Sequence, residues 1–381
     1  MRKVLLAMAL LLVGGCAAAL PSQSPRASTW SAATWSAWPA ALHDARHSGS
    51  STTDGPVHGV VRWQRQLEGA VTPGPVIGPD GVVYASSTAG ILHAVDPLSG
   101  KDRWTYDSHY TGGGDLSVSP LVLPGGDIVW PTPGPRLLVL SPAGALLWSV
   151  VLPATPTSPA SVDGKRVYVG DLLGHVSAID VGTRSLLWTV AVGRVSYGAV
   201  VTDGARVYTT ADAGVTAVDA SGAVVWQRDP HDDITEVSAG LAPDGTVLLG
   251  TNGSREWAYH PDGSTAWNVP RYITYSSPAV TASGLAYVGD HGGTVTAFDA
   301  RTGAVVRSYR LNGAEIWSST ILDSRYRLYY ATQAGHVHGL APDGGPLFDV
   351  NVGGPVDSYP ALSADHALIV GSRNGLLTSI G

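Results

Sequence analysis

Cysteine is nearly absent from this chain, because Cys16 is the single one among 381 residues. Disulfides within the chain and metal sites built on several thiolates are therefore excluded, and stability has to come from packing. Charged residues make up only 14% of the chain, and the formal net charge is −7. That charge argues against a nucleic-acid-binding surface, which is ordinarily basic.

Phenylalanine is also scarce, at 2 residues, while glycine (47), proline (26), tryptophan (12) and tyrosine (15) are plentiful. Frequent turn residues with β-formers between them favour an all-β protein. The length alone suggests two or three domains, but an internal repeat accounts for most of it as one architecture.

The N-terminus has the features of an export signal. Arg2 and Lys3 precede an apolar run at residues 4–13, which is too short to span a membrane as a stable helix. The run ends in Val-Gly-Gly-Cys, which resembles the bacterial lipobox, in which the cysteine becomes the lipidated first residue. An ordinary secretory signal is the alternative. We expect a lipoprotein signal peptide at residues 1–15 and lipidation of Cys16, which would leave no free thiol.

Residues 16–37 are rich in Ala, Ser, Pro and Thr and are predicted to be a flexible tether between the lipid and a folded domain at residues 38–381. The protein is therefore expected to be exported and lipid-anchored. It would sit at the cell membrane or the outer membrane, facing the periplasm or the exterior.

The repeated unit is clearest at residues 91–104, ILHAVDPLSGKDRW. It predicts a strand, a turn opened by Asp96, and a second strand carrying Trp104. In the closest copies the step from the Asp position to the Trp position is eight or seven residues. The Asp at the turn is expected to bond its own backbone, which is a structural role.

A second signal sets the number of repeats. Eight short apolar segments, each with Pro or a small residue at its centre, recur at intervals of 45, 39, 39, 41, 39, 41 and 41 residues. A period of about forty residues is typical of a four-stranded propeller blade. The sequence predicts an eight-bladed β-propeller whose innermost strand starts at each segment.

The two ends of the chain are expected to share the last blade. The chain stops after three strands of that blade, and residues 59–67, GVVRWQRQL, form an outer-type strand with no inner strands before it. If this N-terminal strand completes the eighth blade, the ring closes and no long edge stays unpaired.

Most of the outer strands carry a tryptophan. An indole can pack between blades while its N–H donates to a carbonyl. Arg307 and Phe348 replace it in two blades, which are expected to dock less uniformly or to face a partner. The predicted docking residues are Trp63, Trp104, Trp148, Trp188, Trp226 and Trp267.

The segment AVDPLSGKDRW (residues 94–104) resembles the tryptophan-docking motif of quinoprotein-type, PQQ-like β-propellers. Residues 38–51, WPAALHDARHSGSS, resemble the sequence that leads into the repeats of lipoproteins in this family, which includes the BamB scaffolds of outer-membrane protein assembly. The resemblance implies the fold strongly and the function weakly, since propellers host unrelated activities.

Residues that precede the innermost strands are expected to face the mouth of the central channel. In quinoprotein dehydrogenases, the resemblance implies, such residues hold PQQ and Ca²⁺. No spacing here identifies a Ca²⁺ cage, so a solvated polar funnel with no cofactor and no metal is the prediction. The mouth candidates are Asp115, Arg194, Glu236, Tyr275, Glu315, Trp317, Asp357 and Tyr359.

Other possible sites are weaker. His336 and His338 are two residues apart on a strand and face one side, but no third ligand lies near them in the sequence. His43 and His47 lie in the lead-in segment, where a structural role is expected. No phosphate-binding loop, nucleophile elbow or zinc-protease motif is present.

We therefore expect a monomeric, lipid-anchored ring that binds envelope proteins through rim loops and catalyses nothing. Candidate loops are residues 106–114 and 228–236. Two alternatives remain open: a PQQ- and calcium-dependent quinoprotein oxidoreductase, and a propeller that senses a small molecule or carbohydrate.

Overall fold

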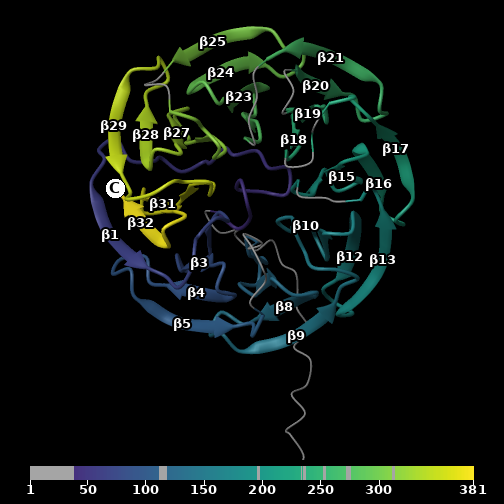
Figure 1. Ribbon diagram of the computed structural model, residues 1–381, viewed down its shortest axis with the longest axis horizontal. Helices are drawn as coiled ribbons and strands as arrows, with labels where there is room; N and C mark the ends of the chain where they lie inside the picture. Colours follow the sequence, from purple (N-terminus) through teal and green to yellow (C-terminus); the bar gives the residue numbers. More distant parts are fainter. Residues whose placement is uncertain are drawn as a thin grey trace, which may run out of the picture. The chain divides into compact units, whose positions relative to one another are not determined.

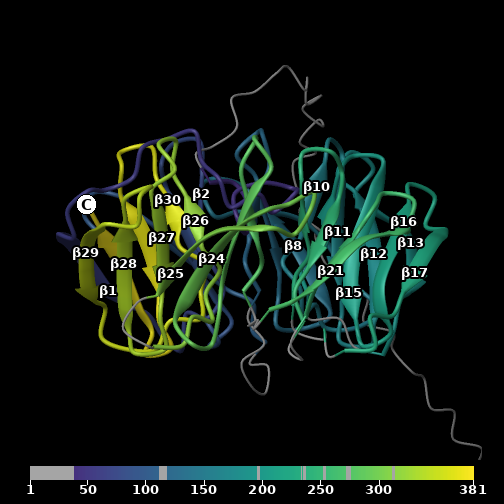
Figure 2. The ribbon, with the colours of Figure 1, turned by 90° about the horizontal axis from the view of Figure 1, so that it is seen from above.

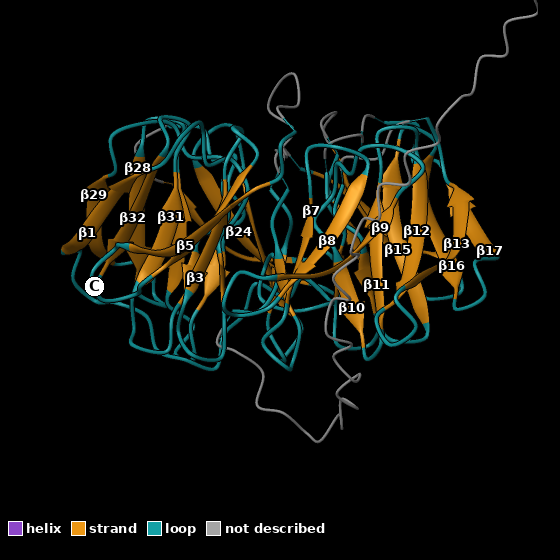
Figure 3. Ribbon diagram, turned by 90° about the horizontal axis from the view of Figure 1, so that it is seen from below, coloured by secondary structure: helices purple, strands orange, loops and turns teal. Residues whose placement is uncertain are grey.

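The computed structural model describes residues 38–110, 118–194, 198–232, 234, 237–251, 255–271, 276–310 and 314–381. Contacts divide the chain into Met1–Ala32 and Ala33–Gly381, and the described residues all belong to the second unit. Within them the secondary structure is strand only, as Figure 3 shows. In this part of the chain no helix is long and apolar enough to cross a membrane.

Eight four-stranded antiparallel sheets are arranged around one axis as the blades of a propeller, which confirms the predicted fold (Figure 1). Blades 1 to 7 consist of β2–β5, β6–β9, β10–β13, β14–β17, β18–β21, β22–β25 and β26–β29, and blade 8 of β30, β31, β32 and β1.

The strand nearest the axis is short in every blade. The innermost strands are β2 (Val76–Ile77), β6 (Leu121–Val122), β10 (Ser161–Asp163), β14 (Val201–Thr202), β18 (Gly240–Leu241), β22 (Ala279–Val280), β26 (Ile321–Leu322) and β30 (Ala361–Leu362). The second strands are β3 (Val83–Ser86), β7 (Ile128–Pro131), β11 (Arg166–Gly170), β15 (Arg206–Ala211), β19 (Val247–Leu249), β23 (Leu285–Gly289), β27 (Leu328–Ala331) and β31 (Leu368–Gly371).

The two outer positions carry longer strands. The third strands are β4 (Ile91–Val95), β8 (Arg136–Leu140), β12 (His175–Asp180), β16 (Gly214–Asp219), β20 (Arg255–Tyr259), β24 (Thr294–Asp299), β28 (His336–Leu340) and β32 (Leu376–Ile380). The outermost strands are β5 (Asp102–Asp107), β9 (Leu146–Val151), β13 (Ser185–Ala191), β17 (Val224–Arg228), β21 (Thr265–Pro270), β25 (Val305–Arg310), β29 (Pro346–Asn351) and β1 (Val61–Gln66).

Burial follows the position in the blade. Second strands such as β3 and β7 are buried along their whole length, because both faces of an inner strand pack against neighbouring blades. Outer strands such as β5 alternate between half-buried and exposed residues. The core therefore lies between blades: one cluster joins Val139 of blade 2 to Val167 and Ile179 of blade 3. Figure 2 shows the sheets standing side by side.

The ring closes through its two ends, as predicted. β1 pairs antiparallel with β32, with Trp63 opposite Ser379 and Gln66 opposite Leu376. The predicted strand at residues 59–67 is thus the outermost strand of blade 8. Across the seam to blade 1, Arg65 pairs with Asp102 at 2.6 Å.

Tryptophans of the outer strands contact the next blade along the ring. Trp226 Nε1 donates to the carbonyl of Pro261 at 2.8 Å, and the indole covers Gly263, where a Cβ would lie 2.7 Å from the ring. Gly263 has a φ of +83°, which glycine adopts without strain. The same N–H to carbonyl bond is made by Trp63 to Pro97, Trp104 to Pro142, Trp188 to Ala220 and Trp267 to Ala300.

Three outer strands depart from this pattern. Trp148 packs half-buried against the core between blades 2 and 3. In blade 6, Arg307 donates to the carbonyl of Asp343 at 2.8 Å, and Tyr309 covers Gly344 in place of an indole. In blade 7, Phe348 lies over Gly59, at the start of the closing strand.

The segment at residues 38–56, here called the strap, crosses the centre of the ring (purple in Figure 1). Its backbone carbonyls accept hydrogen bonds from the last residue of the innermost strand in six blades, taken in ring order. The pairs are Ile77 to Trp38, Val122 to Pro39, Thr202 to Ala45, Leu241 to Arg46, Val280 to Ser48 and Leu322 to Gly49. One end of the channel is thus covered by the chain itself.

Candidate functional site

The end of the channel away from the strap is built from two kinds of connection. The first kind is the link from one blade to the next, which ends at the first residue of the innermost strand. The second kind is the turn between the second and third strands of a blade, which lies beside these links. In blade 1, for example, the link residue Ser108, after β5, donates its backbone N–H and its Oγ to the carbonyl of Gly90 in such a turn. We call this end the loop mouth. It is the end at which the sequence placed its candidate residues.

Five of the eight mouth candidates are described: Arg194, Glu315, Trp317, Asp357 and Tyr359. Asp115, Glu236 and Tyr275, and the lipidation candidate Cys16, lie outside the described residues.

Glu315, Trp317 and Asp357 belong to one polar cluster on blades 6 to 8. Trp317 Nε1 donates to Glu315 Oε2 at 2.8 Å, and the guanidinium of Arg373 lies 5.7 Å from the centre of the Trp317 ring. Arg373 also pairs with Asp357, whose other oxygen accepts from Gln333 Nε2 at 2.6 Å. A cation held against an aromatic face and a carboxylate at once is fixed in position.

Arg194 and Tyr359 lie outside that cluster. The side chain of Arg194 is 92% exposed and its Nε is 3.7 Å from Asp212. Tyr359 packs against the core at Gly74, where a Cβ would lie 2.7 Å from its ring. Burial raises the pKa of Tyr359 to about 12, so the phenol stays neutral. Tyr359 is therefore a packing residue at the base of the mouth.

Two blades present the same exposed histidine turn at this mouth. In residues 107–109 and 229–231, an Asp accepts from the backbone N–H of the His two positions on, at 2.6 Å and 2.7 Å. Both side chains, His109 and His231, are 87% exposed, with their Nδ1 atoms 3.4 Å and 3.0 Å from the same carboxylates. These turns lie in the two loops that the sequence proposed as partner contacts.

The described residues of the mouth do not by themselves fit PQQ with Ca²⁺. Ca²⁺ takes about six to eight oxygen ligands, and a dehydrogenase base has to reach the quinone. Here Glu315 is bonded to Trp317, and Asp357 is bonded to both Arg373 and Gln333. Among the described residues no three His, Cys, Asp or Glu side chains gather in a metal-binding arrangement.

His336 and His338 gain a carboxylate neighbour that the sequence spacing did not reveal. Asp349, opposite His338 on β29, has its Oδ1 2.5 Å from His336 Nδ1 and 3.8 Å from His338 Nδ1. Tyr330 stacks on His338 at 4.9 Å. Burial lowers the pKa of His338, which favours a neutral imidazole.

Sequence reasoning missed the partners from the second turn of each blade: Arg373, Gln333 and His291, whose ring lies 6.1 Å from that of Trp317. The signal was available, since in a propeller these turns and the links between blades share one face. Nothing in the spacing of residues 38–56 indicated the path of the strap.

Comparison with protein families gives matches to the model described as "Outer membrane protein assembly factor BamB" at residues 55–172, 133–271 and 174–325. Among curated proteins, the outer membrane protein assembly factor BamB of Yersinia pestis is 27% identical over 262 residues, which cover 63% of this chain. The chain spans 64% of the length of that relative.

Two solved structures share the fold. BamB from Moraxella catarrhalis superposes with a TM-score of 0.68 at 18% identity, covering 84% of this chain and 99% of its own. The quinohemoprotein alcohol dehydrogenase from Comamonas testosteroni gives 0.71 at 14% identity, covering 90% and 80%. One architecture is thus shared with an assembly factor and with an enzyme, so the site has to distinguish the two.

Proposed function

The chain belongs to the family of the outer membrane protein assembly factor BamB, and from this membership we propose that it is a cell-envelope scaffold that binds other proteins and catalyses no reaction. The scaffold would work by rigid recognition. A closed ring would hold the described cluster of its mouth, from Glu315 to Arg373, in a fixed position, so that these side chains need not be ordered when a partner binds.

One observation carries this proposal: in the described part of the loop mouth, the polar groups on blades 6 to 8 are bonded to one another. Glu315, Asp357 and Arg373 form contacts within the cluster rather than converging on a common point. Meanwhile the Asp-His turns project outward, and the ring of Tyr110, which is 37% exposed, lies against Gly134 of blade 2. Exposed aromatic and imidazole groups on a rigid base are typical of a protein-binding surface.

The N-terminus is proposed to attach the ring to a membrane. Residues 1–15 would be the lipoprotein signal, Cys16 the lipidated residue, and residues 16–37 the tether. The proposed location is therefore a membrane surface of the envelope. Cys16→Ala should move the protein from the membrane fraction to the soluble fraction or leave it unprocessed; an unchanged membrane fraction would argue against lipidation.

The partner does not transfer from the relatives, because the chain spans only 64% of the Yersinia protein. We propose an envelope protein that meets the loop mouth, and a photo-crosslinking residue tests this in the native envelope. Placed at Tyr110 or Trp317 it should yield one discrete adduct. Placed at Val306, which is 62% exposed on an outer strand, it should yield none. Adducts at Val306 alone would contradict binding at the mouth.

The second candidate, a quinone-dependent oxidoreductase, is supported by Trp317, because this indole lies at the mouth beside a cation and two carboxylates. Such an enzyme would need further oxygen ligands for Ca²⁺ from residues that lie outside the described ranges. A scaffold requires no cofactor, whereas the oxidoreductase has to bind a quinone, so a titration with the quinone distinguishes the two candidate functions.

A further inference from the structure

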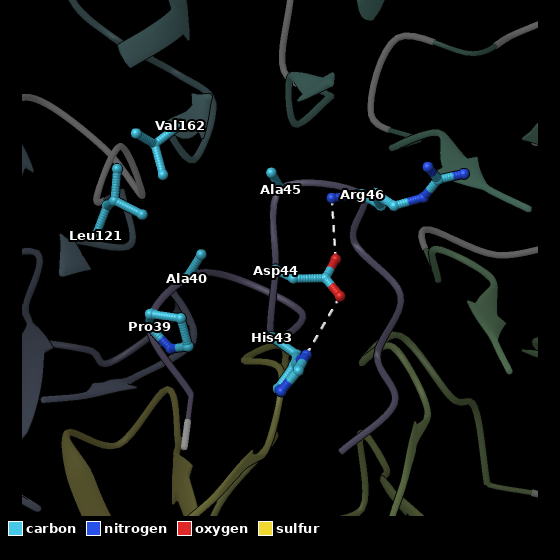
Figure 4. Close-up of a pocket in the computed structure, with 8 residues that line it drawn as sticks. All are labelled: Pro39, Ala40, His43, Asp44, Ala45, Arg46, Leu121 and Val162. Carbon is cyan, nitrogen blue, oxygen red and sulfur yellow. Dashed lines mark hydrogen bonds and ion pairs between the residues drawn. The ribbon is translucent and has the colours of Figure 1, made fainter. Parts of the chain in front are cut away.

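The row of backbone hydrogen bonds between the strap and the innermost strands is interrupted at blade 3. Its carbonyls bond blade 2 at Pro39 and blade 4 at Ala45. In blade 3, among the described residues, the bond to the strap comes from a side chain, Ser161 Oγ, which donates to the Ala45 carbonyl at 3.2 Å. Between these contacts the strap bulges away and leaves a cavity of about 350 Å³ (Figure 4). It is lined by Pro39, Ala40, His43, Asp44, Ala45, Arg46, Leu121 and Val162.

Most of this cavity wall is apolar. Leu121 and Val162 of the innermost strands form one side, and Pro39 and Ala40 of the strap form another, as Figure 4 shows. An engineered apolar cavity of about 150 Å³ accommodates benzene, so this one has room for a two-ring molecule. Burying such a molecule would be favoured by the apolar area that it removes from water.

All the hydrogen-bond acceptor positions of the Asp44 carboxylate are occupied by groups of the strap itself. Its Oδ1 accepts from the backbone N–H groups of Arg46 and Ser48, at 2.9 Å and 3.1 Å. Its Oδ2 accepts from Ser48 Oγ at 2.6 Å and lies 3.3 Å from His43 Nδ1. Burial raises the pKa of Asp44, but the bonds and charge of His43 and the bonds of Ser48 outweigh it and lower the pKa to about 2. Four donors occupy the four lone-pair positions of an ionised carboxylate.

His43 therefore supplies the free polar atom of the wall. Its Nδ1 faces the Asp44 carboxylate (dashed in Figure 4), so in the neutral form of the ring Nδ1 is the donor and Nε2 is the acceptor. No described group bonds Nε2. The positive charge of Arg46 offsets the negative charge of Asp44 along this edge.

The backbone at this edge is strained. Leu42 and His43 have φ values of +52° and +82°, in the left-handed region that non-glycine residues rarely adopt. Strain of this kind gathers at ligand-binding sites, where the surrounding structure holds it.

We propose that this cavity is a binding site for a neutral, mostly apolar molecule of one or two rings that carries one hydroxyl or N–H group, which donates to Nε2 of His43. The ligand would fill the gap between the strap and blades 2 and 3. This site is at the strap end of the channel, so the inference is independent of protein binding at the loop mouth.

Calorimetric titration of the purified protein with 2-naphthol tests the proposal, with 2-methoxynaphthalene as the matched compound that lacks the donor. We expect saturable binding of 2-naphthol with one site, and a several-fold weaker affinity for the ether. Ala45→Phe would place a ring in the cavity and should weaken naphthol binding at least tenfold. Ala282→Phe, the same change at an exposed turn of blade 6, should leave the affinity unchanged.

A second variant covers the case in which Ala45→Phe does not fold. His43→Asn removes the imidazole and tolerates a left-handed backbone, so it should abolish the preference for naphthol over the ether. Absence of saturation by naphthol on folded protein would overturn the site. Equal affinities for the two compounds on the unmodified protein would overturn the role of His43, as would a preference that survives in His43→Asn.

Discussion

At the scale of the residue, the ring is organised by an indole lying on a glycine of the next blade. The sequence predicted the tryptophans, because they recur at a fixed step from a turn. The sequence did not identify the glycine on which each indole packs, because a glycine in a turn is already explained by its φ. The structure gives Gly263 two reasons to be glycine: its φ of +83° and the Trp226 ring above it.

The two reasons can be separated by comparing two Gly→Ala variants. Gly204 has a similar φ of +88° but nothing within 4 Å of an added Cβ, whereas a Cβ at Gly263 would lie 2.7 Å from the Trp226 ring. A left-handed alanine costs about 1–2 kcal/mol, and overpacking adds about 1–3 kcal/mol. Chemical unfolding should therefore show a larger loss of stability for Gly263→Ala; equal losses would mean that the indole does not press on this turn.

His47 of the strap predicts a pH dependence of stability. It is fully buried, and neither ring nitrogen has a hydrogen-bond partner in the described structure. Burial lowers its pKa from 6.5 to about 4, although the charge of Asp44 raises it. Between these two values the unfolded chain is protonated and the folded chain is not, so stability falls as the pH drops from 6.5 to 4, by about 3 kcal/mol in all.

The pH dependence of stability has to be measured as a difference from a variant without His47, because Glu256 changes the stability with pH in the opposite direction. Burial raises the pKa of Glu256 to about 7 against the lowering effect of Arg271, so its contribution is lost as the pH rises from about 4.5 to 7. His47 has a φ of +53°, and His47→Asn introduces a residue that tolerates this left-handed backbone and does not titrate. Its stability relative to the unmodified protein should rise as the pH falls through 6.5 to 4; a difference independent of pH would contradict a buried neutral His47.

At the scale of the element, the blades were predictable and the strap was not. Blade strands carry alternating residues between turns with Gly, Asp or Pro, and those turns fix the strand ends: all eight innermost strands begin within three residues of the predicted segments. The strap has no such pattern. Its structure depends on carbonyls that meet six separate blades, and backbone groups leave no trace in the sequence.

The strap predicts a group of amides that exchange together. Gly49 has a φ of +59°, and a Cβ there would lie 2.9 Å from that of Ala279. Gly49→Ala should therefore lift the strap and speed hydrogen exchange at the six donor amides, from Ile77 in blade 1 to Leu322 in blade 7, with β3 and β4 unaffected. Gly164→Ala, at a φ of +50° in open space, is the control. Faster exchange near Ala279 alone would show that the strap is not one unit.

The mouth cluster falls between these cases. Glu315, Trp317 and Asp357 were predicted from their place before an innermost strand, and the structure brings them together. Arg373 and Gln333, which hold Asp357, come from turns that are forty or more residues apart in sequence from one another, so only the closed ring makes them neighbours.

At the scale of the whole molecule, the first and last strands, β1 and β32, meet inside blade 8, and β1 borders the seam between blades 8 and 1. His93 lies there, 3.1 Å from Glu68 and 3.2 Å from Asp102, beside the Arg65–Asp102 pair. Trp63 docks across the same seam. If β1 left blade 8, the facing edges of β1 and β32 would be exposed, and unpaired edges bind readily to another chain.

Two tryptophan variants separate docking from closure. Trp63→Ala and Trp226→Ala each remove a mostly buried indole and its hydrogen bond, so both should lower the free energy of unfolding by about 3–5 kcal/mol. Only Trp63→Ala loosens β1, the strand that closes the ring, so it alone should form dimers or larger species as the concentration rises in light scattering. Oligomers from both variants would mean that the closing strand has no special role.

The central claim is recognition without chemistry, and a titration of the protein with PQQ and Ca²⁺, followed by tryptophan fluorescence, tests it most directly. Trp317 lies at the mouth and would report a quinone bound there. We predict a flat titration on folded protein, with no Ca²⁺ dependence. Saturable quenching that Ca²⁺ strengthens, and that Glu315→Ala or Asp357→Ala weakens, would contradict the scaffold and assign the mouth to a quinone cofactor.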